Sequence, residues 1–328
     1  SMASMNELIH KEVMESFSNF FVNSNYILGP NVEKFEKEYS NYNGTQFCIG
    51  TSNGLDSLIL CLKSLNIGKG DEVIVPSNTF IATVLAVIHC GATPVFVEPN
   101  IKTYNLNHCL LETALTAKTR AVIAVNLYGN PCDFSNILKF TKKNKIYLIE
   151  DNAQAQGASW EGKFTGSFGD VNAVSFYPGK NLGAFGDSGA ITTNSKELDK
   201  IIRSLRNYGS SIKYENEFIG YNFRMDECQA GFLSIKLKYL VDWNNERIKT
   251  SQIYFNELSN IEELILPTIL KNAKSVFHIF NIRTSKRNEL KEFLAKNGIE
   301  TLIHYPIPPH LQVCLKHLNF KIIIKNSQ

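Results

Sequence analysis

Asp151 has a position in the sequence that suits the binding of a flat ligand. It ends the apolar run Ile146-Tyr-Leu-Ile-Glu-Asp, which predicts a place at the carboxyl end of a parallel strand. Open α/β sheets bind their ligands at that edge. The next residues, Asn152-Ala-Gln-Ala-Gln-Gly-Ala, allow close approach and offer amide hydrogen bonds. Alone, an aspartate at a strand end more often caps the next turn, so the site hypothesis needs further residues.

Lys180 lies in a loop that could place an amine in a cleft. The chain has 34 lysines and arginines, and most are expected in solvent. Lys180 differs because it follows Pro178 and Gly179, after a strand-like segment, and stands before a series of glycines. A desolvated lysine near another cation has a lowered pKa and becomes nucleophilic. This context makes Lys180 a candidate for covalent chemistry.

A third segment, Gly50-Thr-Ser-Asn-Gly-Leu-Asp-Ser-Leu, could bind an anion. It precedes a helical stripe of apolar residues at positions 55, 58, 59, 62 and 65. The first turn of a helix has free backbone N–H groups, and the helix dipole favours an anion there. Ordinary capping of the helix explains this segment equally well. Together, however, an anion-binding helix start, a carboxylate and a lysine are what pyridoxal phosphate requires.

The elements that must position these residues alternate between strand and helix. Strands are predicted at 72–75, 94–98, 121–127 and 146–149, with helices at 79–90 and 133–143. This alternation predicts a doubly wound α/β/α domain with a mostly parallel sheet. Two short strands flank the glycine-rich loop within 171–193, and helical periodicity dominates at 196–205 and 226–258.

The remainder of the chain predicts a second, smaller α/β domain. Strands are expected at 277–283 and 300–303, with a helix at 286–297 between them. We therefore divide the chain into a large cofactor-binding domain, residues 6–240, and a small C-terminal domain, residues 241–328.

Composition excludes several classes of function. The 328 residues carry a net charge of only +3, without blocks of like charge, so we expect neither nucleic acid nor a membrane surface as partner. The seven cysteines are widely spaced and form no Cys-x-x-Cys pair. This favours reduced cysteines in a cytoplasmic protein and gives no indication of a metal site.

At these residues the sequence resembles the DegT/DnrJ/EryC1/StrS family of sugar aminotransferases, within the fold-type I pyridoxal-phosphate enzymes. The resemblance runs from about Ile27 to Leu311. Its motifs are the Lys180 loop, Gly70-Asp-Glu-Val-Ile-Val-Pro-Ser-Asn-Thr-Phe-Ile-Ala-Thr, Glu150-Asp-Asn-Ala-Gln-Ala-Gln-Gly-Ala, Arg206-Asn-Tyr-Gly, Gly220-Tyr-Asn-Phe-Arg-Met-Asp-Glu and Ile303-His-Tyr-Pro-Ile-Pro-Pro-His-Leu-Gln.

The resemblance implies a role for each matching residue. Lys180 would form the Schiff base, Asp151 would pair with the pyridinium nitrogen, and Gln154 would contact the phenolic oxygen. The other implied residues are Phe80, which would stack on the ring; Gly54, Leu55 and Ser175, which would hold the phosphate; Asn222, which would reach over from a second subunit; and Tyr177, His304 and Tyr305, which would lie near the sugar.

The resemblance also implies the reaction. Gly54-Leu-Asp-Ser and Pro178-Gly-Lys-Asn-Leu-Gly-Ala-Phe-Gly-Asp look like the branch that acts at C3 of dTDP-3-keto-6-deoxyhexoses, with L-glutamate as amino donor. The shared site implies a two-fold homodimer. The C4 configuration of the sugar and its destination, whether O-antigen of lipopolysaccharide, another glycan or an antibiotic, stay open.

Other interpretations remain at this point. After Gln312 the chain departs from the family pattern, which predicts a small domain that lacks some of its elements. A C4 aminotransferase of the same family is the nearest alternative. A family dehydratase would carry histidine in place of Lys180. A regulatory or impaired cofactor-binding protein is the alternative from another class.

Overall fold

The large sheet brings the three candidate segments to one edge. In the computed structural model, which describes residues 2–318 and 320–324, its strand order is β1-β9-β8-β5-β4-β2-β3-β13. β9 is antiparallel to both of its neighbours, and the other pairs are parallel. In this order the strands span Phe47–Thr51, Gly189–Thr193, Val171–Ser175, Tyr147–Asp151, Thr119–Val125, Glu72–Pro76, Thr93–Val97 and Ile322–Ile323.

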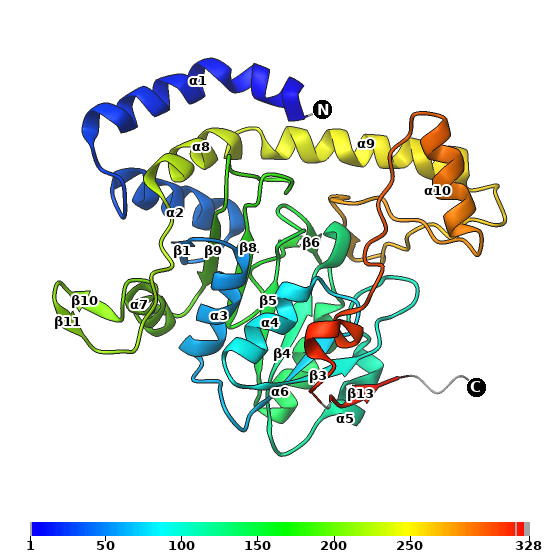
Figure 1. Ribbon diagram of the computed structural model, residues 1–328, viewed down its shortest axis with the longest axis horizontal. Helices are drawn as coiled ribbons and strands as arrows, with labels where there is room; N and C mark the ends of the chain where they lie inside the picture. Colours follow the sequence, from blue (N-terminus) through cyan, green and yellow to red (C-terminus); the bar gives the residue numbers. More distant parts are fainter. Residues whose placement is uncertain (1, 319, 325–328) are drawn as a thin grey trace.

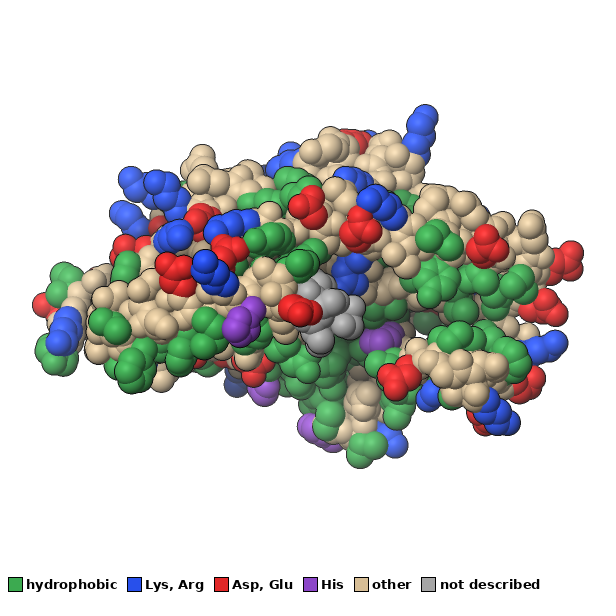
Figure 2. Space-filling model, turned by 90° about the horizontal axis from the view of Figure 1, so that it is seen from above, with side chains coloured by type: hydrophobic (Ala, Val, Ile, Leu, Met, Phe, Trp, Pro, Cys, Tyr) green, Lys and Arg blue, Asp and Glu red, His purple; other side chains and the backbone are tan. Residues whose placement is uncertain are grey.

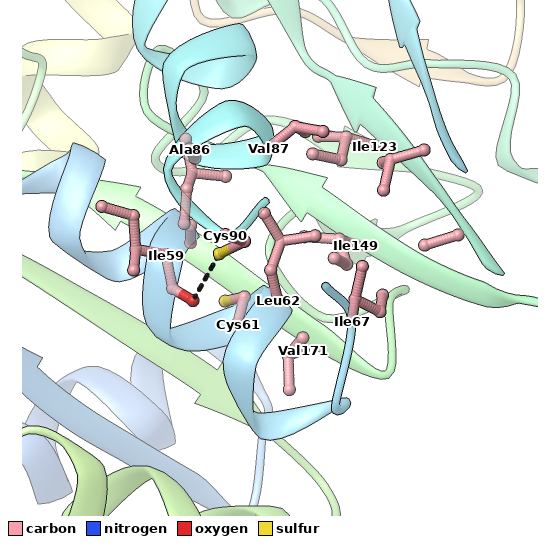
Figure 3. Close-up of a cluster of buried hydrophobic side chains, with 14 of the residues drawn as sticks. Ile59, Cys61, Leu62, Ile67, Ala86, Val87, Cys90, Ile123, Ile149 and Val171 are labelled. Carbon is pink, nitrogen blue, oxygen red and sulfur yellow. Dashed lines mark hydrogen bonds between the residues drawn. The ribbon is translucent and has the colours of Figure 1, made fainter. Parts of the chain in front are cut away.

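Helices cover both faces of this sheet (Figure 1). α3 (Gly54–Ser64), α4 (Ile81–His89) and α7 (Lys196–Leu205) enclose one apolar core, part of which is drawn in Figure 3. α5 (Leu111–Ala114) and α6 (Phe134–Asn144) cover the other face. Because strand side chains alternate, Ile123 of β4 lies in the first core and Val122 in the second. The expected α/β fold-type I architecture is confirmed.

A layer of helices lies beside the sheet and is centred on α8 (Glu227–Leu237). α8 packs against α1 (Met2–Asn23) and α2 (Pro30–Asn43), and α9 (Leu240–Leu258) follows it (Figure 1). The buried Glu227 carboxylate accepts the backbone N–H groups of Gly29, Asn31 and Val32 at 2.7–2.9 Å. Since these N–H groups belong to the start of α2, Glu227 joins the ends of two helices.

Charged side chains of both signs are interspersed on the molecular face drawn in Figure 2. This mixture agrees with the small net charge of +3. Within residues 2–318 and 320–324, no helix is both long and apolar enough to cross a membrane.

The second half of the chain contributes smaller elements around the sheet. β12 (Ala273–Lys274) pairs with β6 (Ser159–Trp160), which pairs with β7 (Lys163–Phe164). β10 (Ser210–Ile212) and β11 (Glu215–Asn216) form a hairpin. α10 spans Arg287–Lys296, and short 3-10 helices span His108–Leu110, Leu127–Gly129, Pro309–Leu311 and Val313–Leu315.

Two predicted strands of the small domain are wrong. In the described chain, segment 277–283 forms only an isolated bridge from Arg283 to Ile265, and segment 300–303 forms no strand. In the first segment the rings of Phe277 and Phe280 both pack on Phe255 of α9, at 5.9 and 5.1 Å between centroids. These two rings are three residues apart and both face α9. In a strand, by contrast, residues three apart would point to opposite faces. The predicted helix is confirmed as α10.

The division at residues 240 and 241 stays a proposal. The described end of the chain does not stay with the predicted small domain, because Ile322 and Ile323 pair with Phe96 and Val97 of β3. We therefore propose that the small domain comprises residues 241 to about 305. We assign β13 to the large sheet.

Candidate active site

Asp151 is buried at the carboxyl end of β5, where it is only 6% exposed. The Thr83 hydroxyl of α4 donates to Asp151 Oδ2 at 2.7 Å, and the Ala153 N–H donates to Oδ1 at 3.2 Å. Burial raises the pKa of Asp151, while these two hydrogen bonds and the charge of Lys180 oppose the rise. A buried carboxylate in this state is electrostatically suited to a cationic partner such as a protonated ring nitrogen.

Lys180 lies in the loop between β8 and β9, which folds back tightly on itself. The Lys180 N–H donates to the Tyr177 carbonyl and the Ala184 N–H to the Phe176 carbonyl, both at 2.8 Å. A side chain at Gly183 would place its Cβ 2.4 Å from the Pro178 oxygen, so this turn requires glycine. Burial lowers the pKa of Lys180, and the Asp151 charge opposes the change. At a given pH, the neutral and nucleophilic form of the amine is therefore more populated here than it would be in solvent.

The start of α3 faces the end of β8. Asn53 caps the helix by accepting the Asp56 N–H at 2.9 Å, which leaves the N–H groups of Gly54 and Leu55 without a partner inside the helix. A Cβ at Gly54 would lie 2.7 Å from the Ser175 Cβ, so a side chain there would occupy the narrow space between the two elements. Glycine therefore lets the start of α3 pack directly against the end of β8, so that its free N–H groups and Ser175 lie next to each other.

Gln154 connects the sheet edge to the segment around His304. Its Oε1 accepts the Tyr128 N–H at 2.6 Å, and its Nε2 donates to the Tyr305 hydroxyl at 3.1 Å. The Tyr128 hydroxyl donates to the His304 carbonyl at 2.5 Å. The Phe80 ring lies 5.6 Å from the Tyr305 ring and is 54% exposed. The structure therefore brings Phe80, Gln154, His304 and Tyr305 together.

Two predicted residues lie apart from this group. The Tyr177 side chain is 58% exposed, although its backbone belongs to the Lys180 loop. Asn222 is exposed and pairs through its backbone with Asn207. Within the described chain, the Asn222 side chain makes no hydrogen bond to any other candidate residue, so its role stays a proposal.

Three residues of the site, Thr83, His278 and Arg247, were not predicted from the sequence. Thr83 lies inside a quoted motif, but no local signal identifies it as the partner of Asp151.

His278 is a neutral imidazole in this site. Burial, with Lys180, Arg247 and His304 nearby, lowers the pKa of His278 to about 3. The neutral ring lies 3.1 Å from Asn181 Oδ1, an acceptor, so His278 Nδ1 carries the proton and Nε2 can accept a hydrogen bond. Arg247 adds a partly buried cation, and this burial lowers the pKa of its guanidinium group.

These residues fit pyridoxal phosphate. Free N–H groups at the start of α3 suit its phosphate, the buried Asp151 suits its ring nitrogen, and Lys180 suits its aldehyde. The exposed face of Phe80 is available for stacking on the ring. In the described residues, no cluster of three or more histidine, cysteine or acidic side chains could hold a metal ion.

Comparisons with known proteins agree with this site. Residues 7–327 match the profile of the DegT/DnrJ/EryC1/StrS aminotransferase family. The chain is 48% identical, over 94% of its length and 85% of the relative, to dTDP-3-amino-3,6-dideoxy-alpha-D-galactopyranose transaminase of Aneurinibacillus thermoaerophilus. It is 43% identical, over 93% of its length and 80% of the relative, to dTDP-3-amino-3,4,6-trideoxy-alpha-D-glucose transaminase of Streptomyces venezuelae.

Solved structures show the same fold. The crystal structure of S. venezuelae DesV in complex with a ketimine intermediate superposes with a TM-score of 0.95 at 42% identity, covering 97% of this chain and 86% of that one. Enzymes of this family use pyridoxal phosphate, and the structural neighbours include forms with pyridoxal and pyridoxamine phosphate. The expected cofactor is therefore confirmed.

Replacement of Lys180 by alanine should shift the visible absorbance band of the cofactor-loaded protein and lower turnover by about 10²–10⁴-fold, the range for a positioned acid–base group. The loss is expected because the variant lacks the amine that would bond the aldehyde of the cofactor and move the proton. Absorbance spectra and steady-state rates measure both effects. Lys200→Ala, at an exposed position on α7, is the control. Wild-type turnover in Lys180→Ala would show that another residue carries the chemistry.

Replacement of Thr83 by valine should raise the pKa of Asp151, because the hydroxyl stabilises the ionised carboxylate. A hydrogen bond to a charged group contributes roughly 1.5–3 kcal/mol, which corresponds to a rise of roughly 1–2 pH units. The ionised form would then be lost at a higher pH as the solution is acidified. Carboxyl NMR titration of cofactor-free protein, with Asp151→Asn to assign the signal, measures the shift. Thr83→Ser keeps the hydroxyl and should titrate as wild type; equal titration of the valine variant contradicts the assignment.

Proposed function

Because the chain belongs to the DegT/DnrJ/EryC1/StrS aminotransferase family, we propose that it transfers the amino group of L-glutamate to C3 of a dTDP-linked 3-keto-6-deoxyhexose. The convergence of the partly buried Lys180 and the buried Asp151 in one site carries this proposal. The C3 position is supported by the names of the two relatives, both of which are transaminases of dTDP-3-amino sugars. The product would be a dTDP-3-amino-3,6-dideoxyhexose.

Lys180 and Asp151 have complementary tasks in this proposal. Bound pyridoxal phosphate supplies an electron sink for the carbanion formed when an α-carbon loses its proton. The Lys180 amine, whose pKa burial lowers, removes that proton from glutamate and later returns one to C3 of the sugar. The Asp151 carboxylate would pair with the ring nitrogen of the cofactor and keep that nitrogen protonated. L-glutamate first gives its amino group to the cofactor, and the keto-sugar then receives it in the same site. Ping-pong kinetics follow from this order.

The remaining candidate residues orient the reactants. Ser175 and the N–H groups of Gly54 and Leu55 would hold the phosphate. Tyr305, held by Gln154, and the adjacent His304 would contact the sugar, with the exposed Tyr177 at the entrance. Burial raises the pKa of the Tyr305 hydroxyl, so it stays protonated and can donate to a sugar oxygen.

We further propose that the protein is a homodimer of the cytoplasm. Exposed apolar side chains on and near the β10–β11 hairpin, among them Ile212, Tyr214 and Ile219, support an interface in the same part of the chain as Asn222. All seven cysteines are unpaired, which suits a reducing compartment.

The decisive test is a visible spectrum of the cofactor-loaded protein before and after addition of L-glutamate. We expect the visible band to fall as a shorter-wavelength band rises, and a dTDP-3-keto-6-deoxyhexose to reverse the change. NMR of the aminated product then determines whether the nitrogen is on C3 or C4; a C4 amine would support the C4 aminotransferase. Cofactor that responds to no amino donor would contradict the proposed reaction and favour a regulatory role.

Mixed subunits test the dimer and the role of Asn222. Lys180→Ala and Asn222→Ala homodimers should each be weak, but mixing and refolding them should restore activity. In the mixed dimer, one site has Lys180 from one subunit and Asn222 from the other. Light scattering should also give twice the chain mass of 36.9 kDa. A mixture no more active than its components would place Asn222 outside the partner's site.

A further inference from the structure

The loop that carries Lys180 is attached to α8 by three side chains. Gln229, Phe232 and Lys236 lie three and four residues apart, so they share one side of the helix. Gln229 Oε1 accepts the Phe185 N–H at 2.9 Å, and the Phe232 ring meets the Phe185 ring edge to face at 5.3 Å. These contacts fix the part of the loop that follows Lys180.

Lys236 makes the third of these attachments. Its Nζ donates to the Gly183 carbonyl at 2.7 Å and lies 3.8 Å from the centre of the Phe185 ring. The residue is only 7% exposed, and within the described chain no acidic side chain forms an ion pair with it. Burial lowers the pKa of Lys236 to about 8, so the ammonium is the main form at pH 7.

A buried ammonium with a single carbonyl acceptor contributes little to the stability of a fold, because its burial has a large desolvation penalty. The loss of its hydration costs several kcal/mol, and an apolar side chain of similar length would fill the same space without that cost. The ammonium does, however, give the Gly183 carbonyl a directed donor and the Phe185 ring a cation–π contact. Both contacts restrict the loop backbone.

We propose that Lys236 is a positioning residue, which fixes residues 183–185 and thereby the direction from which Lys180 reaches the site. The link is short, because a Cβ at Gly183 would lie only 2.4 Å from the Pro178 carbonyl oxygen, so Gly183 is in close contact with the segment that leads into Lys180. Lys236 acts through the backbone, since burial and Asp151 are what shift the pKa of Lys180. The inference rests on the proposed function.

Replacement of Lys236 by methionine tests this role. At pH 7 we expect kcat to fall by about tenfold or more, as for a misplaced reacting group, while KM for L-glutamate stays near wild type. The visible circular dichroism of the bound cofactor should change, because it reports the orientation of the ring. Hydrogen exchange at the Ala184 amide should become faster, while the amides of α8 stay protected. Lys236→Arg, which can keep both contacts, should recover most of kcat.

The controls separate this inference from the proposed function. Lys238→Met removes an exposed lysine of the same region, bonded to Glu12, and should leave all readouts unchanged. If Lys236→Met does not fold, Gln229→Met removes a neighbouring attachment and should change the same readouts. A folded variant with wild-type kcat, dichroism and Ala184 exchange overturns the role of Lys236. Wild-type protein that fails to convert glutamate overturns the proposed function instead.

Discussion

Asp151 is buried, Lys180 beside it is partly buried, and the rest of the site depends on the balance between the charged and neutral forms of both groups. Burial raises the pKa of the carboxyl and lowers that of the amine, so each group is driven toward its neutral form. Their mutual attraction opposes this only while the geometry is fixed. Hydrogen bonds from Thr83 and Ala153 hold the carboxylate, and the tight turn at Gly183 limits where the amine can go.

The same strand end organises the opposite side of the site. Adjacent strand residues point to opposite faces, so Glu150 points away from Asp151 and is fully buried. Its carboxylate accepts the N–H groups of Gly166 and Phe168 and the side-chain amide of Asn126. Because Asn126 begins the turn whose Tyr128 N–H donates to Gln154, one strand end orders both the cofactor side and the substrate side.

Sequence periodicity predicted the middle strands of the large sheet, and strand ends and glycine spacing identified the three candidate segments, because these signals are local. It did not predict the two outermost strands, β1 and β13. Thr83 and His278 had no such signal. Thr83 is 68 residues from Asp151, and His278 is 97 residues from Asn181, so their roles arise only from tertiary contacts. The strand predicted at 277–283 failed for a similar reason, since aromatic packing on α9 overrides the apparent alternation.

The segment around His304 illustrates how distant contacts complete the site. Gln154 and Tyr128 hold it from the sheet side, across separations of 151 and 176 residues. The chain beyond it is fixed to the edge of the sheet: Leu315 is buried in the core, and the Glu98 N–H donates to the Ile323 carbonyl at 2.8 Å. The entropic cost of bringing the two ends of a loop together grows only slowly with the length of the loop. The substrate side can therefore be built from residues far along the chain, provided that both flanks are fixed to the domain that holds Asp151.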